Sequence, residues 1–233
     1  MLAHNRWLQR IIGGSWMERL GLGAISAAQE ALLKQHKNPD VVRLVKRVRR
    51  ERRSLLTAYE CFTVYSLAGA CRHLGGDLAE VGVFQGSSAR LLCEAKGDSE
   101  LHLFDTFEGL PASAEQDRGI HRESQYACSL DSVQRYLDDF KNVHFYKGRF
   151  PDGAHAIGDR QFSFAHFDVD LYESTLACLE FFYPRMQPGG VMLSHDYSVL
   201  SGVRQAVDEF LHNKPERCVE FPSTQCMIIK LAV

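Results

Sequence analysis

The chain has 233 residues, of which 45% are hydrophobic and 24% charged, a size that allows one substantial core with a smaller appendage. Its formal charge of -2 gives no basis for general affinity toward nucleic acid or anionic membranes, so we expect neither as a partner. No stretch approaches the apolar length needed to cross a bilayer, and the seven cysteines show no paired spacing. We therefore expect a cytoplasmic protein whose cysteines are reduced core residues.

The first third of the chain has a helical pattern. Apolar residues recur at spacings of three and four in "ISAAQEALLKQH", "DVVRLVKRVRRERRSLL" and "AYECFTVYSLAGACRHL". This pattern predicts a helical N-terminal extension over residues 1–75, which we expect to form a lid or wall of a binding site.

From residue 76 onward short apolar runs alternate with amphipathic stretches. The runs "DLAEVGVF", "ELHLFDTF", "NVHFYKG", "FSFAHFDVD", "GGVMLSHDY" and "QCMIIKL" are strand-like, and stretches such as "SSARLLCEAKG" and "GVRQAVDEFLHN" fall between several of them. The alternation predicts an α/β fold, a doubly wound Rossmann-like parallel sheet over residues 76–233. Ligands bind such sheets beyond the carboxyl ends of the strands, where the strand order reverses.

The stretch "EVGVFQGSS" places a glycine-rich turn between a strand and a helix. Gly82 and Gly86 allow a tight turn, and the helix that follows offers free N–H groups. A dinucleotide fingerprint starting at Gly82 would need glycine at positions occupied by Phe84 and Ser87, so the turn disfavours NAD. It suits a ligand with an amino-acid moiety, whose ammonium group Glu80 could meet. The alternative is a purely structural turn.

The strand in "LHLFDTFEGLP" ends in Asp105. In such folds a carboxylate at the end of the second strand, 20 to 25 residues after the glycine turn, binds the ribose hydroxyls. The spacing from Gly82 to Asp105 fits this pattern. The alternative role for Asp105 is a helix cap or turn residue.

Two further strands end in acidic residues and a histidine. "HFDVDLYEST" carries Asp168 and Asp170, and "SHDYS" carries His195 and Asp196. Asp168, His195 and Asp196 could converge at one rim of the sheet and hold Mg²⁺ or Mn²⁺, the imidazole favouring Mn²⁺. A site without metal is the alternative, in which Asp170 caps the helix beginning near Ser174.

In this order the motifs "GDLAEVGVFQGSSA", "LHLFDTFEGLP", "YKGRFPD", "FAHFDVDLYESTLACLEFFYPRM", "PGGVMLSHDYS", "GVRQAVDEF" and "TQCMIIK" resemble a known family. It is the class I S-adenosylmethionine-dependent O-methyltransferases related to macrocin O-methyltransferase and the novobiocin sugar methyltransferase. The resemblance runs from about Leu55 to Lys230. It implies a seven-stranded sheet with the last strand antiparallel, and methyl transfer from S-adenosylmethionine to a hydroxyl.

Carried over by position, the resemblance also implies site residues. The residues that bind the cofactor would be Glu80, Gly82, Val83, Gly86, Ser87 and Ser88 at its methionine end, with Asp105 and Thr106 at its ribose. Asp168, His195 and Asp196 would be the metal ligands. The family pattern has a pair of acidic residues where this chain has His195 and Asp196, so the metal requirement is open and the general base is either Asp168 or His195.

By the same resemblance, the partner is a small-molecule hydroxyl acceptor, a sugar or glycosylated metabolite. The long polar loop Ala112–Leu130 is expected to form part of the substrate wall. The sequence leaves the oligomeric state open, with a homodimer as the commonest state of soluble oligomers. Two other functions stay open from the residues alone: a glycosyltransferase that uses the DxD acids to bind the manganese of a nucleotide sugar, and a non-catalytic binding protein with the methyltransferase fold.

Overall fold

The computed structural model describes residues 16–112, 115–117 and 120–232. Its elements in chain order are α2 Trp16–His36, α3 Pro39–Glu51, α4 Ala58–Cys71, η2 Arg72–Leu74, β1 Asp77–Val81, α5 Ser87–Ala95, β2 Leu101–Asp105, η3 Glu115–Asp117, α6 Leu130–Tyr136, β3 Val143–Lys147, η4 Asp152–Ile157, β4 Phe162–Phe167, α7 Tyr172–Phe182, η5 Tyr183–Arg185, β5 Met186–Ser194, α8 Ser201–Leu211, β6 Cys218–Glu220 and β7 Cys226–Ile229. Of the predicted helical extension, residues 1–15 lie outside the described part.

The strands form one seven-stranded sheet in the order β3-β2-β1-β4-β5-β7-β6. The strands β1 to β5 are parallel to one another, and β7, the last strand in the chain, runs antiparallel to both β5 and β6. The order reverses between β1 and β4, so a binding crevice is expected beyond the carboxyl ends of these two strands. The predicted fold class, with its antiparallel last strand, is confirmed.

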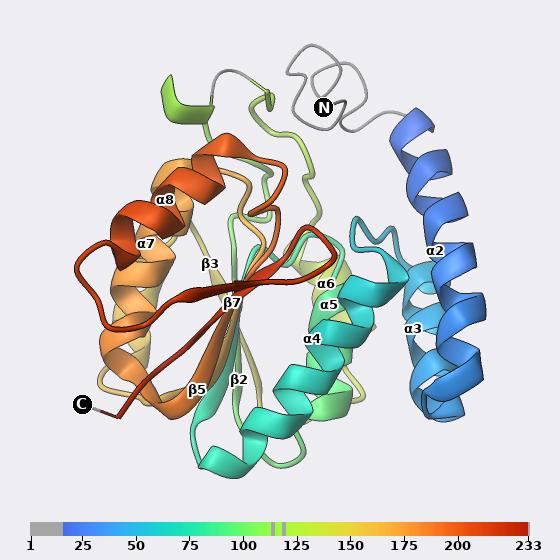
Figure 1. Cartoon of the computed structure of the whole chain (residues 1–233), viewed down its shortest axis with the longest axis horizontal. Helices are drawn as coiled ribbons and strands as arrows, with labels where there is room; N and C mark the ends of the chain where they lie inside the picture. The colour runs from blue at the N-terminus through green and yellow to red at the C-terminus, as the bar shows by residue number, and fades with distance from the viewer. Residues whose placement is uncertain (1–15, 113–114, 118–119, 233) are drawn as a thin grey trace.

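Alternation along the strands divides the core between the two faces of the sheet. On one face Leu78 and Leu103 pack with residues of α3, α4 and α5, while on the other Ala79 and Phe104 pack with residues of α7 and α8. Both sets are almost fully buried. Figure 1 shows the same layering, with α7 and α8 on one side of the sheet and α4, α5 and α6 on the other.

The N-terminal helices form an additional layer on the α4 face. Helix α4 contacts β4 and β5 directly, whereas α2 and α3 lie outside it (Figure 1). Helix α4 begins with a capping box, in which the Thr57 side chain accepts from the N–H of Glu60 and the Glu60 side chain accepts from the N–H of Thr57. Helix α3 begins with Asn38 as N-cap and Pro39 in its first turn. The lid role of this region stays a prediction.

The observed boundaries differ from the predicted ones in a few places. The apolar run expected to continue to about residue 56 ends as a helix at Glu51, because Arg52 is extended. Helix α6 ends at Tyr136 and is shorter than "SLDSVQRYLDDF" suggests. Strand β6 has three mostly exposed residues, so it lacks the apolar pattern that would have marked it as a strand.

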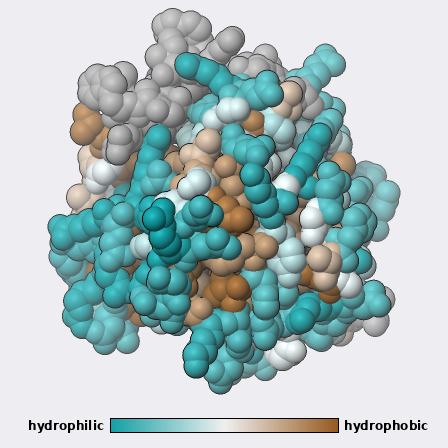
Figure 2. All heavy atoms as spheres, turned by 180° about the vertical axis from the view of Figure 1, so that it is seen from behind, coloured by the Kyte–Doolittle hydropathy of each residue, from teal (hydrophilic) through white to brown (hydrophobic). Residues whose placement is uncertain are grey.

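All seven cysteines are free, and five of them are buried. Among the described residues, the structure contains no helix of the length and apolarity required for a membrane span. On the face turned away from the viewer of Figure 1, hydrophobic residues gather near the centre and hydrophilic residues surround them (Figure 2).

Candidate active site

A pocket of about 830 Å³, partly open to solvent, lies beyond the carboxyl ends of the central strands. Six of the residues predicted to bind a cofactor line it: Gly82, Val83, Ser87, Ser88, Asp105 and Thr106. Leu55 and Leu56, from the connection before α4, form another part of the wall, together with Gln125 and Tyr126. A largely apolar lining with a few polar groups is typical of a small-molecule site.

The glycine turn has the backbone conformation that its sequence predicts. Gly82 and Gly86 have φ values of +88° and +82°, which side chains rarely allow. Gly86 is the N-cap of α5, and the first residues of that helix, Ser87 and Ser88, are buried. Gly86 does not line the pocket, so its role is to shape the turn. Phe84 also has a positive φ, 48°, so the loop between β1 and α5 is held in a conformation unusual for its residues.

Asp105 fixes this loop from the neighbouring strand. Its Oδ2 accepts hydrogen bonds from the backbone N–H groups of Val83 at 2.7 Å and Phe84 at 2.9 Å, while Oδ1 accepts from Phe107 at 2.6 Å. The Thr106 hydroxyl also lies 3.5 Å from Oδ1, so contacts within the chain already number about as many as a carboxylate has acceptor positions. The turn role considered for Asp105 is therefore present, and the ribose contact stays a prediction.

Glu80 lies behind the pocket and does not line its wall. Its carboxylate is fully buried, and Oε1 lies 2.8 Å from Nδ1 of the equally buried His166. Burial raises the pKa of Glu80, partly offset by hydrogen bonds from His166 and Ser88. Glu80 thus connects β1 to β4 beneath the site, and its contact with an ammonium group stays a prediction.

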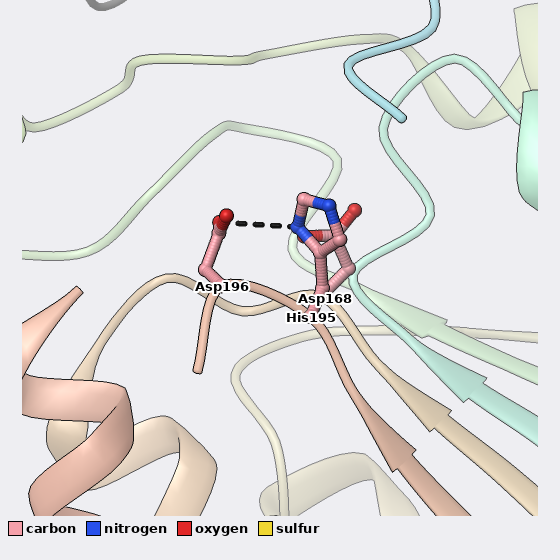
Figure 3. A group of neighbouring side chains, drawn as sticks. All are labelled: Asp168, His195 and Asp196. Atoms are coloured by element: carbon pink, nitrogen blue, oxygen red, sulfur yellow. Dashed lines mark ion pairs between the residues drawn. The ribbon is translucent and has the colours of Figure 1, made fainter. Parts of the chain in front are cut away.

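The structure brings Asp168, His195 and Asp196 together at the ends of β4 and β5 (Figure 3). His195 Nδ1 lies 3.1 Å from Asp168 Oδ1 and 3.1 Å from Asp196 Oδ2. This buried nitrogen nevertheless makes no hydrogen bond with either carboxylate, because neither oxygen lies in the direction of a ring N–H. One nitrogen and two carboxylate oxygens converging in this way form a donor set that fits a divalent cation.

The cluster carries an excess of acidic groups. Burial raises the pKa of Asp170 well above its ordinary value, and the neighbouring Asp196 and Asp168 raise it further. Burial also disfavours the charged form of His195, yet Asp196, Asp168 and Glu60 raise its pKa well above the usual range. Neighbouring carboxylates add to the effect of burial at Asp170 and outweigh it at His195, and a cation would relieve the repulsion among these acids.

Asp170 does not cap the helix that follows it. Helix α7 begins at Tyr172, two residues earlier than expected, and its N-cap residue Leu171 makes no side-chain cap. The N–H of Tyr172 instead donates to Asp117 Oδ1 at 2.7 Å. Asp170 and Asp196 have positive φ values, 61° and 59°. The backbone therefore turns sharply after both strands.

Glu60 also belongs to this site, although no pattern in the sequence indicated it. Its Oε2 lies 3.6 Å from His195 Nε2, on the side of the ring opposite to Asp168 and Asp196. Burial alone would raise the pKa of Glu60, but His195 together with hydrogen bonds from Thr224 and Thr57 lowers it well below its usual range. The capping-box motif "TAYE" was visible in the sequence, and it predicts a helix start without indicating the distant histidine.

Asp168 is the residue that joins the two parts of the site. It lines the pocket together with Gly82 and Asp105, and it is also a member of the acidic cluster. The backbone holds it there, since the N–H of Asp168 donates to the carbonyl of Val81 at 2.9 Å. His195 and Asp196 are not part of the pocket wall, so they face Asp168 from its far side.

This strand order, with a pocket over the ends of β1 and β2, defines the class I methyltransferase fold. Solved structures share it. The O-methyltransferase NovP superposes with a TM-score of 0.68 at 23% identity, covering 77% of this chain and 82% of that one. CalS11, a calicheamicin methyltransferase, gives 0.61 at 18% identity, covering 83% and 94%.

Comparison with family models identifies the family within this class of methyltransferases. The model of the family Macrocin-O-methyltransferase (TylF) matches residues 69–220, and the chain belongs to that family. The resemblance stated from the motifs is confirmed.

Two curated relatives are similar over the same part of the chain. The chain is 33% identical over 153 residues to 8-demethyl-8-(2,3-dimethoxy-alpha-L-rhamnosyl)-tetracenomycin-C 4'-O-methyltransferase of Streptomyces olivaceus, a match that covers 58% of each protein. It is 30% identical over 151 residues to demethyldecarbamoylnovobiocin O-methyltransferase of Streptomyces niveus, again over 58% of each. The chain therefore spans less than two thirds of the length of these relatives.

Proposed function

We propose that the protein is an S-adenosylmethionine-dependent O-methyltransferase that methylates a hydroxyl of a sugar or a glycosylated small molecule. The observation that supports this most directly is the position of Asp168, which belongs both to the wall of the pocket and to the acidic cluster. A methyl donor in the pocket and a hydroxyl near the cluster would meet at this residue.

The pocket residues fit the proposed cofactor. S-adenosylmethionine would supply a methyl group already activated by the positive charge on sulfur. Gly82 lines the pocket, and the buried Ser87 and Ser88 stand at the start of α5, where N–H groups are free. Asp105 holds the loop in place, and Thr106 next to it donates to the carbonyl of Gly109 at 2.7 Å. The main contribution of these residues is to position two reactants, which can be worth about 7–11 kcal/mol.

Asp168, His195 and Asp196 would hold the metal. An ion there, Mg²⁺ or Mn²⁺, would neutralise the acids and lower the pKa of an acceptor hydroxyl. A histidine among oxygen ligands favours Mn²⁺. The fit rests on the buried Nδ1 without a hydrogen-bond partner and on the two carboxylate oxygens 3.1 Å from it.

Asp168 is the better candidate for the general base. It lines the pocket, whereas His195 is 7% exposed and lies behind it. Burial would raise the pKa of Asp168, but His195 outweighs that effect and lowers it, so the carboxylate stays ionised and can accept a proton. The role of His195 is then to hold and orient Asp168 and the metal. A sugar hydroxyl is a poor acid, which is why both the base and the metal matter.

The chemical class of the acceptor is inferred from the names of the relatives. Their names describe methylation of a rhamnosyl tetracenomycin derivative and of a novobiocin precursor, both natural products. We extend this class to the present chain and expect natural product biosynthesis to supply the acceptor.

Titration calorimetry with S-adenosylhomocysteine, followed by transfer of a labelled methyl group to a panel of glycosylated acceptors, tests this function. We expect dissociation constants near the micromolar range, about -8 kcal/mol, and transfer that Asp168→Asn abolishes. Asp139→Asn removes an exposed carboxylate 3.7 Å from Arg90 and serves as the control. Failure to bind S-adenosylhomocysteine, with uptake of a nucleotide sugar instead, would replace the proposal with the glycosyltransferase alternative, and binding without transfer would favour the non-catalytic one.

A further inference from the structure

Glu60 is a buried carboxylate with an unusual number of donors. Oε2 accepts from the N–H of Thr57 at 2.7 Å and from its hydroxyl at 2.8 Å, while Oε1 accepts from the N–H of Thr224 at 3.1 Å and from its hydroxyl at 2.7 Å. Thr57 precedes α4, and Thr224 lies in the connection between β6 and β7. Two segments far apart in the chain therefore hold the same carboxylate, which cannot rotate without losing several bonds.

The fixed carboxylate faces one nitrogen of His195. Oε2 lies 3.6 Å from Nε2, slightly beyond hydrogen-bonding distance, and Nε2 is buried without a hydrogen-bond partner. The other ring nitrogen, Nδ1, faces Asp168 and Asp196. The imidazole thus lies between one carboxylate on its Nε2 side and the predicted metal ligands on its Nδ1 side.

A neutral imidazole carries one proton, and its position decides which nitrogen can bind a cation. An anion fixed beside Nε2 favours the proton on that nitrogen and leaves the lone pair on Nδ1. Histidine ligands of metals almost always donate their second N–H to a carboxylate, a carbonyl or water, which sets both the tautomer and the orientation of the ring.

We propose that Glu60 is a positioning residue that holds His195 with Nδ1 toward the cation site, so that a carboxylate, a histidine and a metal form one chain of contacts. This inference rests on the metal in the proposed function. Where the family pattern has a second acidic residue, this chain has an imidazole, which binds a cation only in its neutral form, and Glu60 supplies a negative charge from behind it. The helical N-terminal region therefore contributes a residue to the metal centre.

The capping box and the connection to Thr224 give Glu60 a structural role as well, and the test has to separate the two. Glu60→Gln keeps the size of the side chain but removes the charge. Its amide NH₂ would also face one of the backbone N–H groups of Thr57 or Thr224, so some loss of stability is expected. Thr224→Val is the matched control, because it removes a hydroxyl from Oε1 and leaves the oxygen that faces His195 unchanged.

The measurement is Mn²⁺ binding by calorimetry, with electron spin echo detection of the nitrogen coupled to the bound Mn²⁺, in the full chain and both variants. We expect the wild type to show histidine nitrogen coupling. In Glu60→Gln, Mn²⁺ affinity should fall by about 10- to 100-fold, with weakened coupling. Thr224→Val should keep both. S-adenosylhomocysteine affinity should be the same in all three proteins, because Glu60 and Thr224 do not line the pocket.

Unchanged Mn²⁺ affinity and nitrogen coupling in Glu60→Gln would overturn the inference, as would equal losses in Glu60→Gln and Thr224→Val. Absence of nitrogen coupling in the wild type would also overturn it. S-adenosylhomocysteine binding and methyl transfer by the same preparations would show separately whether the proposed methyltransferase function stands.

Discussion

A β-carbon placed on Gly82 would lie 1.9 Å from the backbone carbonyl oxygen of Asp168. The glycine turn after β1 is thus in direct contact with the strand end that carries the proposed base. Neither segment can move aside easily, because Val81 pairs with Phe167 in the sheet and its carbonyl accepts from the N–H of Asp168. The glycine turn and the acidic cluster are therefore packed directly against each other.

Gly82→Ala should disrupt both parts of this unit. The added methyl group would clash with backbone, and a φ of +88° is strained for alanine, so we expect a loss of more than about 2 kcal/mol in the free energy of unfolding. S-adenosylhomocysteine affinity should fall at least about tenfold, a loss of 1.4 kcal/mol. Gly69→Ala, in helix α4 with open space around it, should instead stabilise by up to about 1 kcal/mol. Equal effects at both positions, measured by chemical denaturation, would contradict the close contact.

Asp196→Ala should separate metal binding from cofactor binding. Asp196 belongs to the cluster but does not line the pocket. Mn²⁺ affinity measured by calorimetry should therefore fall by more than the roughly 10- to 100-fold loss that is typical when a residue contacting a metal ligand is removed. The affinity for S-adenosylhomocysteine should stay unchanged. Asp159→Ala, at an exposed position, is the control.

Removing the metal with a chelator tests whether methyl transfer requires it. Methyl transfer should fall after treatment with EDTA and return when Mn²⁺ or Mg²⁺ is added, since the metal would lower the pKa of the acceptor hydroxyl. Full activity in the chelated protein would exclude a catalytic metal while leaving the methyl transfer itself intact.

The buried pair of Glu80 and His166 should matter greatly for stability. Both side chains are 0% exposed and their nearest atoms lie 2.8 Å apart, so His166→Ala would leave a buried carboxyl group without its main partner. We expect a cost of about 3–5 kcal/mol. His144→Ala is the comparison, because that ring is 44% exposed beside Glu100, where such pairs contribute about 1 kcal/mol or less. Similar costs for the two variants in urea denaturation would argue against the anchoring role.

Asp77 should contribute to the acid sensitivity of the fold. Burial raises the pKa of this carboxyl, but His102 and Arg160 outweigh burial and bring its pKa below the ordinary 3.8. A folded pKa below the unfolded one stabilises the protein above about pH 4, and the contribution is lost as the pH falls through the folded value. Asp77→Asn should therefore be less stable than the wild type near pH 7, and the difference should shrink toward pH 2. A constant difference across this range would contradict the linkage.

Local patterns were enough to predict most of the fold. The change from helical spacing to alternating apolar runs predicts a doubly wound sheet, and the glycines of "EVGVFQGSS" predict a tight turn, in which Gly82 and Gly86 have positive φ. Asp168, His195 and Asp196 could be grouped in advance because the carboxyl ends of neighbouring parallel strands lie at one edge. Strand β6 was not found from local pattern, because its three residues carry little apolar signal.

The partners of the carboxylates depended on the tertiary structure. Asp105 could be placed at a strand end from the sequence, but only the packed chain shows it accepting from the N–H groups of Val83 and Phe84. Glu60 was recognisable as part of a helix start, yet its other contact, Thr224, is 164 residues away. Periodicity and turn chemistry act over a few neighbouring residues, so they can be recognised in the sequence. The partner of a buried charge depends on which distant segments pack against it in the folded core.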